Sequence, residues 1–588
     1  MSPARSRLLL SAVSASLVLA LLACRSPWSR PPLPPRLVVV LVVDQLRPDR
    51  LSAALPDGLG RLMREGRVFS RARLDYAFSE TCPGHASVST GLLPRRTGIP
   101  ANRFVADGGL SAIYCVLDAT PTGALVGPSP TAGGGPGRAE AGAEARPVVA
   151  EAALGRSPLL LRSDGWARWL KSAHASARVH AVSGKDRAAI LLAGHAADGA
   201  WWLDRKGSGA FVTSRYYREH WPEWAAGWDG ARVRSAAPRE WRHPAHDPQG
   251  RIRRDDYRAE DPRFSRVSPH PLDDPADPQG SLARLGASPY LDRIVIDFAL
   301  ELARAEALGE GDREATDLLA IGLSATDLIG HLYGPFSQES RAALADLDEA
   351  IGELLFALEA RLGRDGFGVV LTADHGVLPL PEWVQEANRP ENGCAVAGGR
   401  IDADALVEAL RTAADDALGT REAARGPWLA LHGLRIHLNH ARLMASGTSR
   451  DSLESVLRER LVAQPGIDRV YDREQVAAVD VIEGPGATSG ADDMEMRRLI
   501  GQAQPPGRGA DLFVVPQPGC LLTSRQYGTS HGSPHDYDRR IPLVFWGPGI
   551  APRVDPRPAR LVDLAPTLAA WLDVGVPADL DGRALPLH

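Results

Sequence analysis

Lysine and cysteine are scarce in this sequence of 588 residues. Its 67 basic residues include only three lysines, Lys171, Lys185 and Lys206, so nearly every positive charge is an arginine. Five cysteines are too few for a small scaffold held together by disulfides. Since 72 acidic residues leave a net charge of -5, the sequence has no basic excess, which argues against nucleic-acid binding through bulk charge. The length suits about three average domains or one elaborate domain.

Long apolar runs are also missing beyond the N-terminus. Leu8 to Leu22 is shorter than the roughly 20 residues that a membrane-spanning helix needs, and two arginines precede it. This pattern predicts a signal peptide over residues 1–23. Small residues directly before Cys24 resemble a bacterial lipobox, so we expect a lipid anchor there, with an ordinary cleaved signal as the alternative. Either way the sequence predicts export, to a bacterial periplasm or to the outer membrane as a lipoprotein.

Residues 24–36 are rich in proline and predict an extended tether between an anchor and a globular body. Export would put the other four cysteines in an oxidising compartment, where disulfides persist. Four cysteines allow three full disulfide pairings. The sequence does not indicate which pairing forms, or whether the thiols stay free and buried instead. These cysteines are Cys82, Cys115, Cys394 and Cys520.

The body begins with a continuous β-branched run, Leu37 to Val43, which is typical of a strand buried on both faces of a parallel sheet. Leu318 to Leu323, Gly368 to Leu371 and Leu543 to Trp546 are similar short runs. Leucines recurring at three and four residues predict a helix over 344–362. The pattern indicates an α/β fold with a doubly wound, mostly parallel sheet and helices on both faces.

We expect one catalytic domain over residues 37–588, interrupted by an irregular cap insertion at about 200–290. Six tryptophans lie in this insertion. Such aromatic density favours packing over substrate stacking.

Ligands of doubly wound sheets gather at the carboxyl ends of strands, so polar residues there are the first functional candidates. Asp44 ends the first strand, where a carboxylate either binds a cation or caps a loop. Pro83 fits the first turn of a helix and puts Thr81 at or just before its N-terminus. Unpaired backbone N–H groups and the helix dipole there would stabilise an alkoxide or a phosphate, although Thr81 could also be a simple N-cap.

Aspartate and histidine recur after the buried strands. Asp327 and His331 are four residues apart, so in a helix both lie on one face and can share a metal ion such as zinc. Asp374 and His375 follow a further strand, and His531 precedes another. Each cluster alone could be a hydrogen-bonded loop anchor. Together they predict two metal sites, which would clamp the attacking and leaving oxygens of an in-line displacement.

As a set, these motifs resemble the alkaline phosphatase superfamily, and most closely its PafA-type branch, which has a threonine nucleophile and a fold like that of type I phosphodiesterases and nucleotide pyrophosphatases. The resemblance runs from Leu37 to about Pro577. It implies hydrolysis of phosphate monoesters through a phosphothreonine on Thr81, with release of inorganic phosphate. The implied ligands are Asp327, His331 and His531 for one zinc ion, and Asp44, Asp374, His375 and the nucleophile Thr81 for the second.

Lys185 and Arg187 stand two residues apart in Val182 to Ile190. If the strand continues through them, both cations lie on one side, beside the non-bridging oxygens of a phosphate. A surface charge pair is the alternative. The resemblance implies that this pair and Asn102 bind the transferred phosphoryl group. Because a monoester dianion carries its extra charge on those oxygens, the two cations favour monoesters over diesters.

The sequence departs from the family pattern in two places. Arg103 and Phe104 follow Asn102 where an aromatic pair similar to Trp-Tyr is expected, so the family pattern does not predict the shape of this loop. His535 stands where a tyrosine often follows Gly-Ser-Pro, as a spare ligand or a simple substitution. We favour His531 over it as the metal ligand.

Three other functions compete with a phosphomonoesterase. A phosphodiesterase or nucleotide pyrophosphatase would share the six metal ligands and the threonine, but the segment with Lys185 and Arg187 argues for a monoesterase. A sulfatase is disfavoured because the segment after Thr81 lacks the arginine of the formylglycine signature. A non-catalytic lipoprotein that binds metal or phosphate would be supported by loss of a ligand, and none is lost. The oligomeric state, the native metals and the physiological monoester cannot be read from the sequence.

Overall fold

The computed structural model describes residues 33–128, 154–243, 253–311, 315–418, 426–477 and 491–587. The expected signal peptide, Cys24 and most of the tether lie outside these residues. Within the described ranges, no helix is both long enough and apolar enough to cross a membrane.

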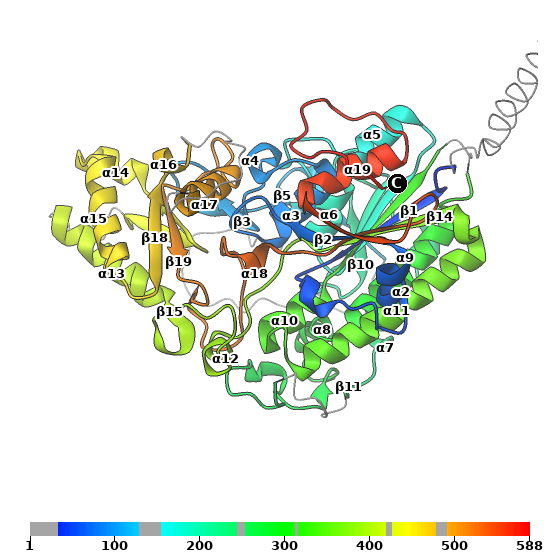
Figure 1. Cartoon of the computed structure of the whole chain (residues 1–588), viewed down its shortest axis with the longest axis horizontal. Coiled ribbons are helices and arrows are strands. Elements are labelled where there is room, and N and C mark those ends of the chain that lie inside the picture. Colours follow the sequence, from blue (N-terminus) through cyan, green and yellow to red (C-terminus); the bar gives the residue numbers. More distant parts are fainter. Residues whose placement is uncertain are drawn as a thin grey trace, which may run out of the picture.

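A ten-stranded sheet lies at the centre of the molecule (Figure 1). In spatial order its strands are β22 (Arg553–Arg560), β2 (Arg67–Arg73), β21 (Leu543–Trp546), β14 (Phe367–Thr372), β1 (Leu37–Val43), β13 (Asp317–Leu323), β8 (Val179–Ser183), β9 (Gly199–Leu203), β10 (Phe211–Ser214) and β6 (Leu125–Val126). The five strands from β14 to β9 run parallel. β21 pairs antiparallel with both neighbours. The apolar run Leu543 to Trp546 therefore forms a strand of the sheet, but not a parallel one.

Helices cover both faces of this sheet, as the sequence predicts (Figure 1). One face carries α2 (Gly58–Glu65), α9 (Tyr290–Ala305) and α11 (Gln338–Leu362). The other carries α3 (Thr81–Thr90), α5 (Trp166–Ala173), α6 (Asp186–Ala193) and α19 (Leu564–Trp571). All seven residues of β1 are buried between these layers, which is why its sequence is apolar without alternation.

The parallel register brings the ends of β1, β13 and β14 to one edge of the sheet. Leu323 pairs with Val43, and Thr372 pairs with Val42. The residues that follow these strands, including the start of α10 (Ala325–Tyr333), therefore meet at this edge.

The first part of the expected cap insertion belongs to the main sheet, because β9 and β10 are sheet strands. Its irregular part follows Ser214 and contains α7 (Gly230–Ser235), β11 (Glu240–Trp241), β12 (His270–Pro271) and α8 (Pro278–Gly286). Trp201, Trp224 and Trp228 pack around Phe298 of α9, with ring centroids 5.1 to 6.0 Å from it. These aromatic side chains therefore pack in the hydrophobic core.

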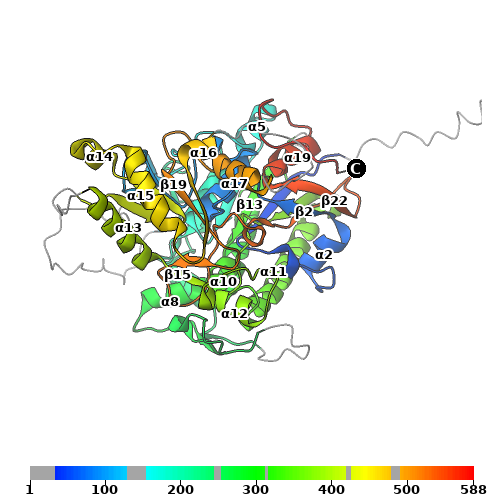
Figure 2. The same cartoon turned by 60° about the vertical axis from the view of Figure 1, so that its left-hand side comes forward.

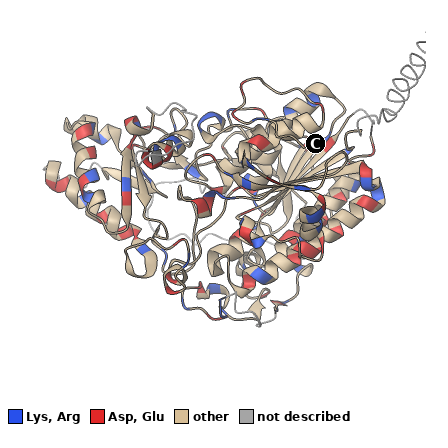
Figure 3. Cartoon of the chain, viewed as in Figure 1, with Lys and Arg blue, Asp and Glu red and all other residues tan. Residues whose placement is uncertain are grey.

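A second, antiparallel sheet lies beside the first and was not anticipated from the sequence (Figures 1 and 2). Its strands in spatial order are β16 (Leu429–His432), β17 (Arg435–Leu438), β19 (Leu512–Pro516) and β18 (Ile467–Asp472). They share a separate apolar core with α13 (Ala403–Leu418) and α15 (Arg450–Val462). Acidic and basic residues are both spread widely over the described part of the chain, in keeping with its nearly balanced charge (Figure 3).

Candidate active site

The first predicted ligand group forms around α10. Asp327 and His331 lie one turn apart on this helix, and His331 Nε2 is 3.2 Å from Asp327 Oδ1. His531 reaches the same carboxylate from far along the chain, with its Nε2 3.7 Å from that oxygen. The structure thus brings together all three side chains that the sequence assigns to one metal ion.

The second predicted group lies at the ends of β1 and β14. His375 Nε2 is 3.5 Å from Asp44 Oδ1 and 3.4 Å from Asp374 Oδ2. All three side chains are buried, and Asp44 Oδ1, Asp374 Oδ2 and His375 Nε2 have no hydrogen-bond partner among the described residues. Burial and the neighbouring carboxylates of Asp327 and Asp374 raise the pKa of Asp44 to about 6. Because buried, unpaired polar atoms are costly, this arrangement fits a bound cation that all three would share.

The three histidines are oriented by backbone carbonyl groups. Each donates its Nδ1–H to a carbonyl oxygen 2.8 or 2.9 Å away, and the acceptors are Gly376 for His375, Thr529 for His331 and Ser79 for His531. A carbonyl oxygen only accepts, so Nδ1 carries a proton in each ring, and in the neutral ring Nε2 carries the lone pair and faces the carboxylates, as in metal sites. Burial lowers the pKa of His375 to about 4 and that of His531 to about 3, which keeps both rings neutral.

Lys185 connects the two groups. Its Nζ contacts the Asp44 carboxylate and lies 2.6 Å from Asp327 Oδ2, so it touches one carboxylate of each group. The expectation that the strand continues through Lys185 and Arg187 is wrong, because β8 ends at Ser183 and α6 begins at Asp186. The alternative of a surface charge pair is also wrong for Lys185, since its side chain is only 1% exposed.

Thr81 is the first residue of α3, as predicted, and is buried. Arg187 Nη2 lies 3.5 Å from Thr81 Oγ1. Asn102 lies beside the same helix end, where its Oδ1 accepts the N–H of Cys82 at 2.9 Å. The structure therefore gathers a hydroxyl, a helix N-terminus, an arginine and an amide next to both ligand groups.

A cavity of about 420 Å³ opens onto this site. His331 of α10 and the loop residues His531 and Asn102 line it on one side, and residues 432–435 of the second sheet and its β16–β17 turn line it on the other. Arg435 of β17 donates hydrogen bonds to Glu80 Oε1 at 3.2 Å and to the carbonyl of Pro100 at 2.7 Å. The second sheet thus supports the segments on either side of Thr81.

Gln45 is a site residue that the sequence analysis missed. Its backbone N–H donates to Asp374 Oδ1 at 3.1 Å, and its Nε2 donates to Asp327 Oδ1 at 2.8 Å. It thereby orients one carboxylate of each group. Its φ of 67° is unusual for a residue other than glycine, and such strain is common at functional sites. Its position directly after Asp44 was the only signal in the sequence.

His535 is not a member of either ligand group. Its Nε2 donates to the carbonyl oxygen of Pro516 at 2.8 Å, which anchors the loop that carries His531. His535 therefore has a structural role and is not a spare metal ligand. Both disulfide bonds are also defined by the structure, Cys82 to Cys115 and Cys394 to Cys520.

Residues 38–538 match the model of the type I phosphodiesterase / nucleotide pyrophosphatase family. The chain belongs to this family. It is 30% identical to alkaline phosphatase PhoK of Sphingomonas over 570 residues, which cover 94% of this chain and 91% of that protein. It is 26% identical to alkaline phosphatase PafA of Elizabethkingia meningoseptica over 560 residues, 94% of each chain.

The crystal structure of wild-type alkaline phosphatase PafA has the same fold, with a TM-score of 0.78. The sequence identity in that comparison is 22%, and it covers 94% of this chain and 98% of the other. The resemblance to PafA-type members of the alkaline phosphatase superfamily, inferred from the motifs, is thereby confirmed.

Proposed function

We propose that this protein is an exported phosphomonoesterase that hydrolyses phosphate monoesters through a phosphothreonine on Thr81. The observation that carries the proposal is the convergence of two cations on the nucleophile and the ligand groups. Lys185 bridges Asp44 and Asp327, and Arg187 reaches the Thr81 hydroxyl. The names of the alkaline phosphatase relatives agree with this function.

The two ligand groups fit two divalent cations, and their mixture of imidazole and carboxylate donors suits zinc. Asp327, His331 and His531 would hold one ion, and Asp44, Asp374 and His375 would hold the other. When bound, such ions neutralise charge on the attacking and leaving oxygens.

The chain's own residues would carry out the displacement at phosphorus. Thr81 Oγ1 forms a bond to phosphorus while the bond from phosphorus to the alcohol oxygen breaks. The Thr81 hydroxyl gives its proton to solvent, and the departing alcohol oxygen takes up a proton from solvent. The unpaired N–H groups at the start of α3 and the guanidinium of Arg187 stabilise the negative charge that develops there. Water then attacks the phosphothreonine, which regenerates the Thr81 hydroxyl and releases inorganic phosphate.

Lys185 and Arg187 would also determine the preference for monoesters. A monoester dianion presents its charged oxygens to both cations, whereas a diester replaces one of these oxygens with a second organic group. Charge-assisted hydrogen bonds to the dianion are therefore partly lost with a diester.

Export is part of the proposal, and the two disulfides support it because such bonds persist in oxidising compartments. The N-terminal sequence further suggests a lipid anchor on Cys24 and a periplasmic location. Radiolabelled palmitate in the purified full-length protein, absent from a Cys24→Ala variant, would test the anchor.

The function is tested by hydrolysis of an aryl phosphate monoester and its methyl diester, with zinc and after chelation. We expect zinc-dependent preference for the monoester, and a preference about 100-fold smaller in Lys185→Ala. Lys171→Ala is the matched control, because this half-exposed lysine pairs only with Asp198 among the described interactions. It should leave the preference unchanged.

The two other outcomes point to specific alternatives. Preference of the wild-type protein for the diester would establish the phosphodiesterase alternative. If the protein binds zinc but cleaves neither ester, it would be a non-catalytic protein that binds metal or phosphate.

A further inference from the structure

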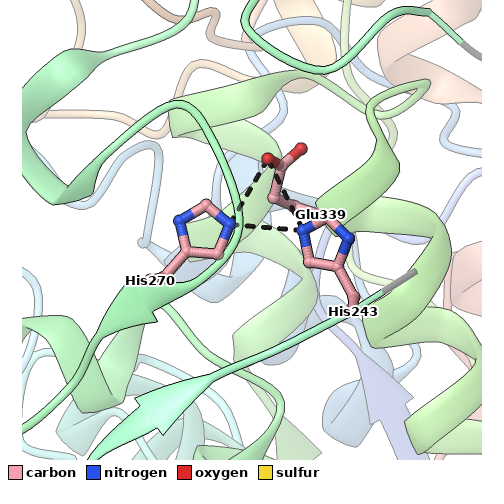
Figure 4. Close-up of side chains that lie close together, drawn as sticks. All are labelled: His243, His270 and Glu339. Atoms are coloured by element: carbon pink, nitrogen blue, oxygen red, sulfur yellow. Dashed lines mark hydrogen bonds and ion pairs between the residues drawn. The ribbon is translucent and has the colours of Figure 1, made fainter. Parts of the chain in front are cut away.

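A third group of metal-binding side chains lies outside the catalytic site, at the N-terminal end of α11. His243 follows β11, His270 lies in β12, and Glu339 is the second residue of α11 (Figure 4). Their nearest ligand atoms all lie within 4.8 Å of one another. None of these residues takes part in the chemistry described above.

The spacing of the three ligand atoms matches a tetrahedral site. The two Nε2 atoms are 3.2 Å apart, and Glu339 Oε1 lies 3.4 Å from His270 Nε2 and 3.8 Å from His243 Nε2. Zinc binds imidazole nitrogen and carboxylate oxygen at about 2.0–2.2 Å, which separates neighbouring ligand atoms by roughly 3.3–3.6 Å in a tetrahedron. The side chains are thus already close to the positions that one shared ion would require.

Burial makes this group costly without a cation. The Glu339 side chain is 0% exposed and both imidazoles are 2% exposed. Neither carboxylate oxygen of Glu339 has a hydrogen-bond partner in the part of the chain that the structure describes. A buried carboxylate without a hydrogen-bond partner is costly, so this arrangement fits a cation that Glu339 and the two imidazoles would share.

The ring of His270 is oriented for metal binding. Its Nδ1 lies 3.2 Å from the carbonyl oxygen of Phe264 and 3.4 Å from the hydroxyl of Tyr333. Because the carbonyl only accepts, Nδ1 carries the proton and Nε2 presents its lone pair to His243 and Glu339. A backbone carbonyl that fixes the tautomer in this way is typical of histidine ligands.

Asp255 adds negative charge beside this group. Both of its carboxylate oxygens are buried without a hydrogen-bond partner among the described residues. Its carboxylate interacts electrostatically with Glu339 and His243. Buried carboxylates without hydrogen-bond partners are costly, and a cation between them would offset that cost.

We propose that His243, His270 and Glu339 bind a third divalent metal ion, with Zn2+ as the best match to two nitrogen donors and one carboxylate oxygen. Asp255 strengthens binding through its charge. The ion has a structural role, because it ties the irregular segment after β10 to the start of α11. Through Tyr333 it also supports α10, the helix that carries Asp327 and His331.

The proposal is tested by the zinc content of the purified full-length protein after dialysis against trace zinc. His270→Gln and Glu339→Gln should each hold one zinc ion fewer per chain than the wild type. His437→Gln is the matched control, since it replaces a buried histidine outside the three groups and should lose none. Asp255→Asn should keep the ion but bind it about 10-fold more weakly.

A double variant, Asp327→Asn with His331→Gln, separates this proposal from the proposed function. It should lose catalytic zinc and keep the third ion, so failure of one site does not imply failure of the other. Anomalous diffraction at the zinc edge from wild-type crystals requires no variant to fold, and we expect a peak between His243, His270 and Glu339. Equal zinc content in wild type and His270→Gln, or no peak at this position, would overturn the proposal in favour of a proton shared by the two imidazoles.

Discussion

Thr81 combines two features that a nucleophilic hydroxyl needs. It is the first residue of α3, so the positive end of the helix dipole acts on its oxygen, and Arg187 approaches that oxygen to 3.5 Å. Neither feature involves the three aspartates and three histidines that would hold the metal ions. The resemblance implies that Thr81 also contacts the second ion, but its loss would leave all six of these ligands, so its role in catalysis can be tested apart from metal binding.

We expect Thr81→Ala to keep the fold and the zinc content while kcat falls by at least about 1,000-fold, because no other hydroxyl replaces the nucleophile. Thr90→Ala, at the other end of the same helix, is the control and should retain turnover. Its hydroxyl donates to the carbonyl of Ala86 at 2.7 Å, away from the site. Turnover of an aryl phosphate and zinc content measure both effects. Full activity in Thr81→Ala would exclude it as the nucleophile.

Residues with the chemistry of metal ligands could be found from the sequence because they follow apolar strands. Asp44, Asp327 and Asp374 all come within a few residues of a strand end, where parallel topology brings them together. Gln45 could not be found in this way, since its role depends on a backbone conformation that the sequence does not reveal. Arg435 comes from a sheet that was itself not anticipated.

At the scale of elements, prediction worked where the hydrophobic pattern was long and unambiguous. β1 agrees with the expected range, and α11 ends at Leu362 as its leucine spacing predicts, although it begins six residues before the expected start, at Gln338. β17 shows why the second sheet was missed. Its sequence Arg-Ile-His-Leu alternates like a strand with one exposed face, yet all four residues are buried, because Arg435 lines the pocket and His437 packs beside the ring of His432.

The two disulfides should differ in their effect on activity. Cys82 directly follows Thr81, and Cys115 donates its N–H to the carbonyl of Asn102 at 3.0 Å, so this bond joins two catalytic segments. We expect the double variant Cys82→Ser/Cys115→Ser to lose activity by about 10-fold or more, because small displacements at a reacting centre are costly.

The matched control is Cys394→Ser/Cys520→Ser. This disulfide closes the longer loop, with a sequence separation of 126 against 33, so its loss should lower stability at least as much. Cys520 lines the pocket, but neither cysteine adjoins Thr81 or Asn102. The kcat of the folded variant should therefore stay closer to that of the wild type than the kcat of the first variant does. Thermal unfolding and turnover measure the two effects separately. Equal loss of kcat in both variants would mean that the first disulfide has no special role at the site.

At the scale of the whole molecule, the second sheet is part of the active protein. It has its own apolar core, and its β16–β17 turn lines the catalytic pocket. Any condition that unfolds this core would therefore remove one wall of the pocket and the support that Arg435 gives to Glu80.

Acid should weaken the second sheet through His437. Burial and the charges of His432 and Arg435 lower the pKa of this ring to about 3, below the value of 6.5 expected in the unfolded chain. Between these values the unfolded state binds the additional proton, so stability falls as pH falls below 6.5. From pH 8 to pH 5 the loss from this group is about 2 kcal/mol. His437→Gln removes the titration, so its thermal midpoint should fall less than that of the wild type over this range. Acid loss of bound metal affects both proteins equally and cancels in the comparison, so equal declines would show that His437 does not set the acid limit.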